Sequence, residues 1–205
     1  LITGLIFVAA LILANQIISI PFDLYSTFVI EEKFGFNRTT LATWIMDQAK
    51  GLLLGAFFGL PLLAALIWIF QSVPMAWLWG WLLVTVFSLA LTYVAPTWIM
   101  PLFNKFQPLK DGQLKTEIHL MAKKCEFPLQ EVFVMDGSKR SSKSNAFFTG
   151  FGKTKRIALF DTLIENHTVP ELVGVLAHEI GHYKCRHIVK SIVTGVFTTG
   201  AMFFL

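Results

Sequence analysis

Three segments of the chain carry no Asp, Glu, Lys or Arg, and they alternate with segments that carry charges of both signs. The uncharged segments are residues 1–22, 51–104 and 191–205. A helix needs about 20 apolar residues to cross the hydrocarbon core of a bilayer. Segment 51–104 holds two such stretches, 51–70 and 75–95, joined by a short turn. The pattern therefore predicts an α-helical integral membrane protein.

The apolar segments also suggest where domains begin and end. A first span is expected over residues 1–20, where Pro21 would end it. The alternative, a signal-peptide core, lacks a basic start and a small-residue cleavage site. Pro96 and Pro101 are expected to disturb or end the third span. We therefore predict three parts: residues 1–101 as a transmembrane region with about three spans, 102–187 as a polar insert, and 188–205 as the start of a further transmembrane helix.

The polar insert has the patterns of a small α+β domain. An amphipathic helix is expected over 110–127, where Leu114, Ile118, Met121 and Cys125 recur at helical spacing. A short β-rich run follows at 131–135. Two further strands, 145–151 and 156–160, are expected to flank a hairpin turn at 152–155. The fold class predicted is thus a helical membrane protein with an inserted α+β domain.

A last helix of the insert has a clear beginning but no clear end. Thr168 and Glu171 form a capping box, and Pro170 stands in the first turn. The apolar positions continue through Leu176 and Ile180. We expect that the helix can continue past His187 into the last apolar segment.

Composition and charge exclude several classes of protein. Hydrophobic residues make up 55% of the 205 residues and charged residues 15%, which excludes intrinsic disorder. Two cysteines exclude a disulfide scaffold. The net charge of +4 has a topological explanation, so no nucleic-acid partner is expected.

The positions of the basic residues predict an orientation. The first connection carries Lys33, Arg38 and Lys50, whereas the turn 71–74 carries no basic residue. All other Lys and Arg residues lie beyond residue 100, in or next to the insert. Basic residues favour the cytoplasmic side of a membrane. We therefore expect the insert in the cytoplasm, and we interpret its cluster of Lys139, Arg140 and Lys143 as a solvated loop rather than a lipid-headgroup contact.

The candidate chemistry lies in the string HEIGH at residues 178–182. His178 and His182 lie four residues apart, about 40° apart around a helix, so both imidazoles can reach one metal ion. Glu179 can then accept a proton from a water whose pKa zinc has lowered. The alternative is a membrane-proximal helix with two interfacial histidines and a solvated glutamate. The capped helix, the adjacent hairpin and the apolar flanks favour the metal site.

Four separated strings in this chain resemble the CAAX prenyl endopeptidases, a family of membrane zinc metalloproteases with several spans. They are PFDLYSTFVIEEKFGFN (21–37), DGSKRSSKSNAFFTGFG (136–152), KRIALFDTLI (155–164) and ELVGVLAHEIGHYKCRH (171–187). Stress-induced bacterial membrane endopeptidases share the zinc motif and strings like SNAF, but not the long match at 21–37.

The resemblance implies one zinc ion per chain, with His178 and His182 as ligands and Glu179 as the general base. It also implies that Asn145, Ala146 and Phe147 border the substrate cleft. In the family the third ligand is a Glu on a later helix, which is expected beyond Leu205. The chain is accordingly expected to be a fragment that lacks the carboxyl-terminal part of the protein and holds an incomplete site.

Other candidates for the third ligand are less favoured. His187 lies about 140° around a continuous helix from His182 and is expected to point elsewhere. His119, His167, Glu165 and Asp161 could approach only through the tertiary fold. Cys125 and Cys185 are interpreted as structural.

The resemblance implies a zinc endopeptidase that cleaves near the carboxyl terminus of proteins, prenylated or not. Its partners would be a peptide or protein substrate and the lipid bilayer. Its location would be the endoplasmic reticulum in a eukaryote or the inner membrane in a bacterium. Two alternatives remain open: a quality-control protease for damaged membrane proteins, and a non-catalytic membrane scaffold.

Overall fold

The computed structural model describes residues 1–149 and 155–205, and they fall into two compact units. One unit comprises Leu1–Leu89 with Gly195–Leu205, and the other comprises Ala90–Thr194. The boundaries fall inside two long helices. These boundaries reflect how densely residues contact one another and not where a membrane would lie. The expected limits 1–101, 102–187 and 188–205 therefore stay a prediction.

Four helices in the described parts of the chain are long and apolar enough to cross a membrane by length and composition. They are α1 (Ile2–Tyr25), α2 (Leu41–Ser72), α3 (Ala76–Val94) and α8 (His187–Phe204). Two of them are extended by π-helical turns: α1 continues through η1 (Ser26–Glu31), and α3 through η2 (Ala95–Ile99) into α4 (Met100–Phe103). The prediction of several apolar helices combined with an α+β domain is confirmed.

Prolines do not end these helices. The prediction that Pro21 ends the first span is wrong, because α1 passes through Pro21, and α2 likewise contains Pro61. A proline removes only one backbone donor from a helix, and neighbouring turns can adjust around the gap. Such an adjustment is visible at Pro96, which lies within the π-helical turn η2. Prolines therefore change the helical geometry here without stopping the chain from remaining helical.

Helix α2 is longer than the sequence pattern indicates. It begins after the N-cap Thr40, whose hydroxyl accepts a hydrogen bond from the Thr43 N–H. Its 32 residues span about 48 Å, whereas the hydrocarbon core of a bilayer is about 30 Å thick. The charged residues Asp47 and Lys50 lie in its first turns. Residues 41–50, which were expected to belong to the connection between the first two spans, thus form the polar end of a long helix.

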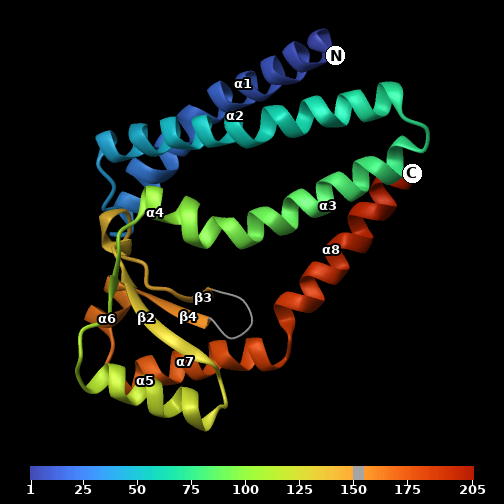
Figure 1. The fold of residues 1–205 in the computed structure, drawn as a ribbon. Helices are drawn as coiled ribbons and strands as arrows, with labels where there is room; N and C mark the ends of the chain where they lie inside the picture. Colours follow the sequence, from blue (N-terminus) through green and yellow to red (C-terminus); the bar gives the residue numbers. More distant parts are fainter. Residues whose placement is uncertain (150–154) are drawn as a thin grey trace. The chain divides into compact units, whose positions relative to one another are not determined.

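Polar and aromatic contacts join the helices of the first unit. Gln16 of α1 donates a side-chain hydrogen bond to Gln48 of α2 at 3.1 Å, and the two helices run side by side (Figure 1). The Trp81 Nε1 of α3 donates to the Val196 carbonyl of α8 at 3.0 Å. At Gly80 an added Cβ would lie 2.8 Å from the Phe203 ring, so only glycine permits this close approach.

A four-stranded sheet organises the second unit. Its strands are β1 (Phe106–Pro108), β2 (Leu129–Met135), β3 (Ala146–Thr149) and β4 (Lys155–Phe160), in the order β1-β2-β4-β3. β2 and β4 are parallel, and the other two pairs are antiparallel. The strands expected near 131–135, 145–151 and 156–160 are present. Most of the expected hairpin turn lies outside the described residues, and β1 was not anticipated.

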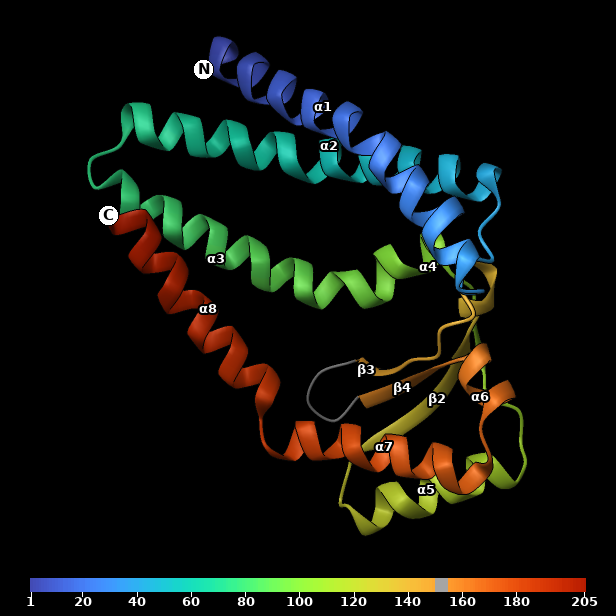
Figure 2. The same cartoon turned by 180° about the vertical axis from the view of Figure 1, so that it is seen from behind.

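Helices α5 (Gln113–Lys124) and α7 (Val169–Lys184) pack against each other and against the sheet, and α6 (Asp161–Asn166) follows β4 (Figure 2). The predicted stripe on α5 is confirmed, since Ile118 and Met121 are buried and Leu114 and Cys125 are partly buried against the same core. The core draws on every strand except β1 and on all three helices; its fully buried side chains include Ile118, Val132, Ile157, Leu159, Leu172, Leu176 and Ile180. Helix α7 is therefore held in place mainly by its contacts with this apolar core.

Candidate active site

Helix α7 is fixed at its start by the predicted capping box. The Thr168 backbone N–H donates to Glu171 Oε2 at 2.7 Å, and Pro170 stands in the first turn. This hydrogen bond, together with that from the Thr168 hydroxyl, holds the pKa of the Glu171 carboxyl below its usual range. The box satisfies backbone donors that the first turn of a helix leaves free. The helix therefore begins at a defined residue, which determines where the later turns fall.

The buried face of α7 determines which way the HEIGH residues point. Leu172, Leu176 and Ile180 recur every four residues and are buried in the core. His178 and His182 each lie two residues past one of these positions, about 200° around the helix. Both histidines are accordingly exposed, whereas Glu179 is half-buried at the border of the two faces.

The two histidines converge on one point. His178 Nε2 and His182 Nε2 lie 3.1 Å apart, and their rings meet edge to face with centroids 4.8 Å apart. Two nitrogens bound to one tetrahedral zinc at 2.0–2.1 Å would lie about 3.3 Å apart. The residues present therefore fit a shared zinc ion with only a small adjustment.

His187 lies next to His182, whereas the rotation of a continuous helix places the two side chains about 140° apart. The expected continuation of α7 is wrong, because the helix ends at Lys184 and a new helix begins at His187. Between them Arg186 adopts a φ of 55°. This left-handed conformation costs roughly 1 kcal/mol in a residue other than glycine. The turn brings His187 Nδ1 to 2.8 Å from His182 Nδ1.

The other side chains considered as third ligands either make hydrogen bonds elsewhere or are not grouped with His178 and His182. Asp161 accepts hydrogen bonds from the Ser138 N–H and hydroxyl, and His167 Nδ1 contacts the Leu163 carbonyl at 3.0 Å. Within residues 1–149 and 155–205, no three His, Cys, Asp or Glu side chains are grouped so that they could hold a metal ion. The described residues thus offer two convergent imidazoles.

The segment expected to border the substrate cleft lies on an edge strand. Among the described strands, β3 is at the end of the sheet, paired only with β4, and it contacts α7. Ala146 is buried in the core, Asn145 is exposed, and Phe147 is half-buried with its ring edge to face against Phe160. The structure therefore brings the three residues and the HEIGH helix into one unit.

The hydrogen bonds of β3 show which backbone groups face outward. The Phe160 N–H donates to the Asn145 carbonyl at 3.0 Å, so Asn145 and Phe160 are a hydrogen-bonded pair. Such pairs alternate along an antiparallel ladder, so the backbone groups of Ala146 and Phe148 point to the free edge. The Asn145 Oδ1 accepts a hydrogen bond from the Ala146 N–H at 2.8 Å. The Asn145 side chain thus lies over the outward-facing backbone of its neighbour.

An aromatic cluster connects the end of α7 to the sheet. The Tyr183 ring packs edge to face on Phe127, with ring centroids 5.0 Å apart, and Phe127 contacts Phe148 of β3. The Lys155 ammonium lies 4.9 Å from the centre of the Tyr183 ring, and partial burial lowers its pKa. These contacts hold the residue next to His182 against β3 and β4.

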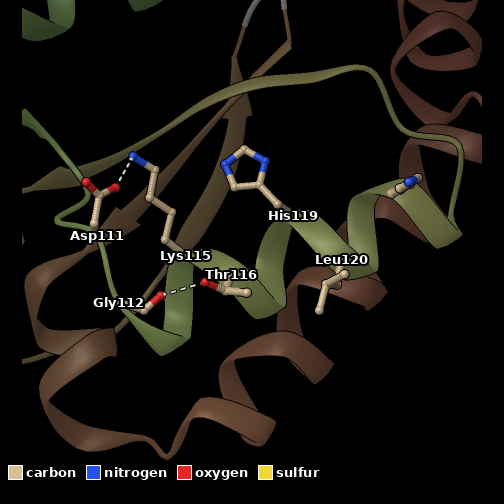
Figure 3. Close-up of a pocket in the computed structure, with 7 residues that line it drawn as sticks. Asp111, Gly112, Lys115, Thr116, His119 and Leu120 are labelled. Carbon is tan, nitrogen blue, oxygen red and sulfur yellow. Dashed lines mark hydrogen bonds and ion pairs between the residues drawn. The ribbon is translucent and has the colours of Figure 1, made fainter.

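A shallow pocket of about 420 Å³ lies on α5 and contains His119 (Figure 3). Lys115 reaches Asp111 at 2.9 Å, which raises the pKa of the Lys115 ammonium. Figure 3 shows His119 projecting beside Lys115 from the same helix. No group of described residues there forms a metal site, so His119 is not brought to the HEIGH histidines.

The basic loop is not uniformly solvated. Lys139 and Lys143 are exposed, as expected, but Arg140 is half-buried. Its guanidinium donates to the Asn104 Oδ1 at 2.6 Å and to the Phe103 carbonyl at 2.9 Å. Arg140 therefore closes the carboxyl-terminal end of α4, where helix carbonyls lack partners and favour a cation.

The chain matches two family models in succession. Residues 1–105 match the model described as "CAAX prenyl protease N-terminal, five membrane helices", and residues 108–205 match peptidase family M48. Together the two models cover almost the whole chain.

Individual proteins match over the same length. CAAX prenyl protease 1 of Saccharomyces cerevisiae is 45% identical over 206 residues, which cover 98% of this chain and 45% of that protein. A homologue from Oryza sativa subsp. japonica is 47% identical over 193 residues, covering 92% and 45%. The crystal structure of S. mikatae Ste24p matches with a TM-score of 0.92 at 43% identity, covering 98% of this chain and 48% of that one.

The chain spans about half the length of the relatives it matches. The matching model of the prenyl protease family covers more than half of the chain, and the M48 match contains the HEIGH helix. From these matches, the helical membrane pattern and the paired histidines, it follows that the chain belongs to the CAAX prenyl protease family of M48 peptidases.

Proposed function

We propose that this chain is part of a membrane zinc endopeptidase that cleaves peptide bonds near the carboxyl terminus of prenylated proteins. The convergence of His178 Nε2 and His182 Nε2 on one point, beside an edge strand, carries the proposal. Relatives named CAAX prenyl protease 1 support the substrate class. The bilayer is the second partner, since four helices are apolar enough to cross it.

Zinc is the metal that the donor set favours. Two neutral imidazoles and a nearby carboxylate are typical of catalytic zinc, which takes three protein ligands and leaves one position open. We assign His178 and His182 as two ligands. We expect the third to be a Glu on a later helix, as the family resemblance implies, and one zinc ion would bind per chain.

The chain's own residues would carry the proton transfers. Zinc, when bound, would polarise the scissile carbonyl and lower the pKa of a water to about 7. Glu179 follows His178 directly, so its carboxylate lies beside the site without being needed as a ligand. It would accept the proton of the attacking water and return it to the leaving amine. Its half-buried position would limit competing hydrogen bonds from solvent.

Strand β3 would hold the substrate in an extended conformation. A protease needs an extended substrate, because a helical peptide uses its carbonyl in an internal hydrogen bond. The outward-facing carbonyl of Ala146 and the backbone groups of Phe148 can pair with such a peptide as an added strand. Asn145 Oδ1 is already used by the Ala146 N–H, so its amide nitrogen is the group that would donate to a substrate carbonyl.

Two substitutions of Asn145 separate this role from a structural one. We expect Asn145→Ala to lower kcat/KM at least tenfold with little change in Tm, a loss of about 1.4 kcal/mol or more. Asn145→Asp keeps an oxygen for the Ala146 N–H but lacks the donor, so it should lose activity similarly. A sharp drop in Tm with normal cleavage by the remaining folded enzyme would make Asn145 a structural residue.

The proposed function is tested with two peptides of one sequence, one farnesylated on its CAAX cysteine and one unmodified. The zinc-loaded full-length protein in lipid vesicles should cleave the farnesylated peptide faster, and a chelator should abolish cleavage. Equal cleavage of both peptides would instead favour a quality-control protease. Absence of both bound zinc and cleavage would indicate a membrane scaffold.

We further propose that the polar insert lies on the cytoplasmic side, because basic residues cluster at 33–50 and beyond residue 100. The eukaryotic sources of the relatives named above favour the endoplasmic reticulum.

After Cys125 and Cys185 are replaced by Ser, a cysteine at the exposed Lys139 should react only with reagents on the cytoplasmic side. A cysteine at the exposed Met75, in the turn before α3, should react only from the opposite side. Labelling of position 139 from the non-cytoplasmic side would overturn the orientation.

A further inference from the structure

The turn between α7 and α8 places a third histidine beside the pair. The Arg186 N–H donates to the Tyr183 carbonyl, and the Lys190 N–H donates to the Arg186 carbonyl, so Arg186 both ends one helix and begins the next. Its positive φ is an unusual choice for a residue with a side chain. Strained conformations of this kind concentrate at functional sites. Here the strained residue directly precedes His187.

His187 meets His182 on the side of the ring away from His178. His182 Nε2 lies 3.1 Å from His178 Nε2, whereas His182 Nδ1 lies 2.8 Å from His187 Nδ1. The rings of His182 and His187 meet edge to face, with centroids 4.8 Å apart and an interplanar angle of 74°. The two nitrogens of His182 therefore have separate neighbours, and His187 Nδ1 does not point to the place where a metal would join the pair.

The contact between His182 and His187 is compatible with one arrangement of protons when His182 binds a metal. A hydrogen bond between two ring nitrogens needs one N–H and one lone pair. Nε2 of a metal-binding His182 must offer its lone pair to the metal, so its hydrogen lies on Nδ1. His187 Nδ1 must then be the acceptor, and its own hydrogen lies on Nε2.

We propose that His187 is a positioning residue for the metal site: its Nδ1 accepts the hydrogen bond of His182 Nδ1–H and holds His182 in the tautomer and orientation that bind zinc. The inference rests on the proposed function, because it assumes that His182 is a zinc ligand. Metal-binding histidines commonly donate their second N–H to such an acceptor, whose loss typically costs 10–100-fold in metal affinity. His187 supplies from the next helix what a carboxylate or carbonyl supplies in other sites.

Two substitutions by residues of similar size, one with a hydrogen-bond acceptor and one without, test the hydrogen bond. His187→Asn places an amide oxygen close to where Nδ1 lies, whereas His187→Leu has a similar shape and no acceptor. In the full-length protein we expect His187→Leu to weaken zinc binding 10–100-fold, measured by competition with a chromophoric chelator. We expect His187→Asn to stay within about threefold of wild type. His119→Leu, a histidine on α5 outside the site, is the matched control and should leave zinc affinity unchanged.

A second measurement separates positioning from ligation. At saturating zinc, X-ray absorption should count the same number of imidazole ligands in His187→Leu as in wild type. One imidazole fewer would show that His187 is a ligand, and wild-type affinity in His187→Leu, or equal losses in the Leu and Asn variants, would also overturn the proposal. Thermal unfolding of the metal-free variants should match wild type. If wild type itself binds no zinc, the proposed function fails, which is a distinct outcome.

Discussion

Replacing Glu179 with Gln is expected to lower kcat by about 10²–10⁴-fold while the protein keeps its zinc, because Glu179 acts as a base and not as a ligand. Gln has the shape of Glu but cannot accept a proton at neutral pH. His178 Nε2 and His182 Nε2 remain in place, 3.1 Å apart, and they do not depend on the Glu179 carboxylate for their orientation in α7. Turnover of the farnesylated peptide and zinc content per chain are the two measurements.

The exposed Glu165 on α6 provides the matched control, since Glu165→Gln removes the same charge outside the site. It should change neither turnover nor zinc content. If Glu179→Gln retained turnover within tenfold of wild type, Glu179 would not be the general base. If it lost zinc, the carboxylate would instead contribute to metal binding.

His182→Ala is expected to remove zinc and activity together. The substitution deletes one of the two convergent nitrogens and leaves His178 as the only ligand from this helix. Zinc affinity should fall by more than the roughly 100-fold that loss of an outer hydrogen-bond partner can cost. Equilibrium dialysis against buffered zinc would measure the affinity, and peptide cleavage in the same buffers would measure activity.

The comparison variant is His167→Ala, because His167 is also an exposed histidine but its Nδ1 contacts the Leu163 carbonyl of α6. It should keep stoichiometric zinc. Stoichiometric zinc in His182→Ala would exclude His182 as a ligand, and the argument for His187 would then fail with it. Because His178 and His182 would share one ion, His178→Ala should behave like His182→Ala.

Local patterns predicted much of the second unit correctly. The stripe of Ile118 and Met121, the capping box of Thr168 and Glu171, and the spacing of His178 and His182 each involve residues within one or two helical turns. Interactions at such short range depend on helix periodicity, which the order of residues specifies directly. The same holds for the four apolar helices, whose length and hydropathy are local properties.

Predictions about where helices end were less successful. Pro21 does not end α1, because a long apolar helix can continue past one missing backbone donor. Conversely, α7 ends at Lys184 without a glycine or proline, because Arg186 adopts a left-handed conformation. Sequence patterns identify such a turn mainly through glycine or asparagine. The rotation calculated for a continuous helix therefore placed His187 on the wrong side of His182.

The order of residues is enough to predict that this chain is helical and apolar enough for a membrane, that it contains an α+β domain, and that two histidines share one helix face. It does not predict that β3 is the edge strand beside α7, that Arg140 bonds to the end of α4, or that His187 meets His182. The first group follows from contacts a few residues apart. The second depends on how separate elements pack and on one strained backbone angle, where the energy of the whole fold outweighs the preference of a single residue.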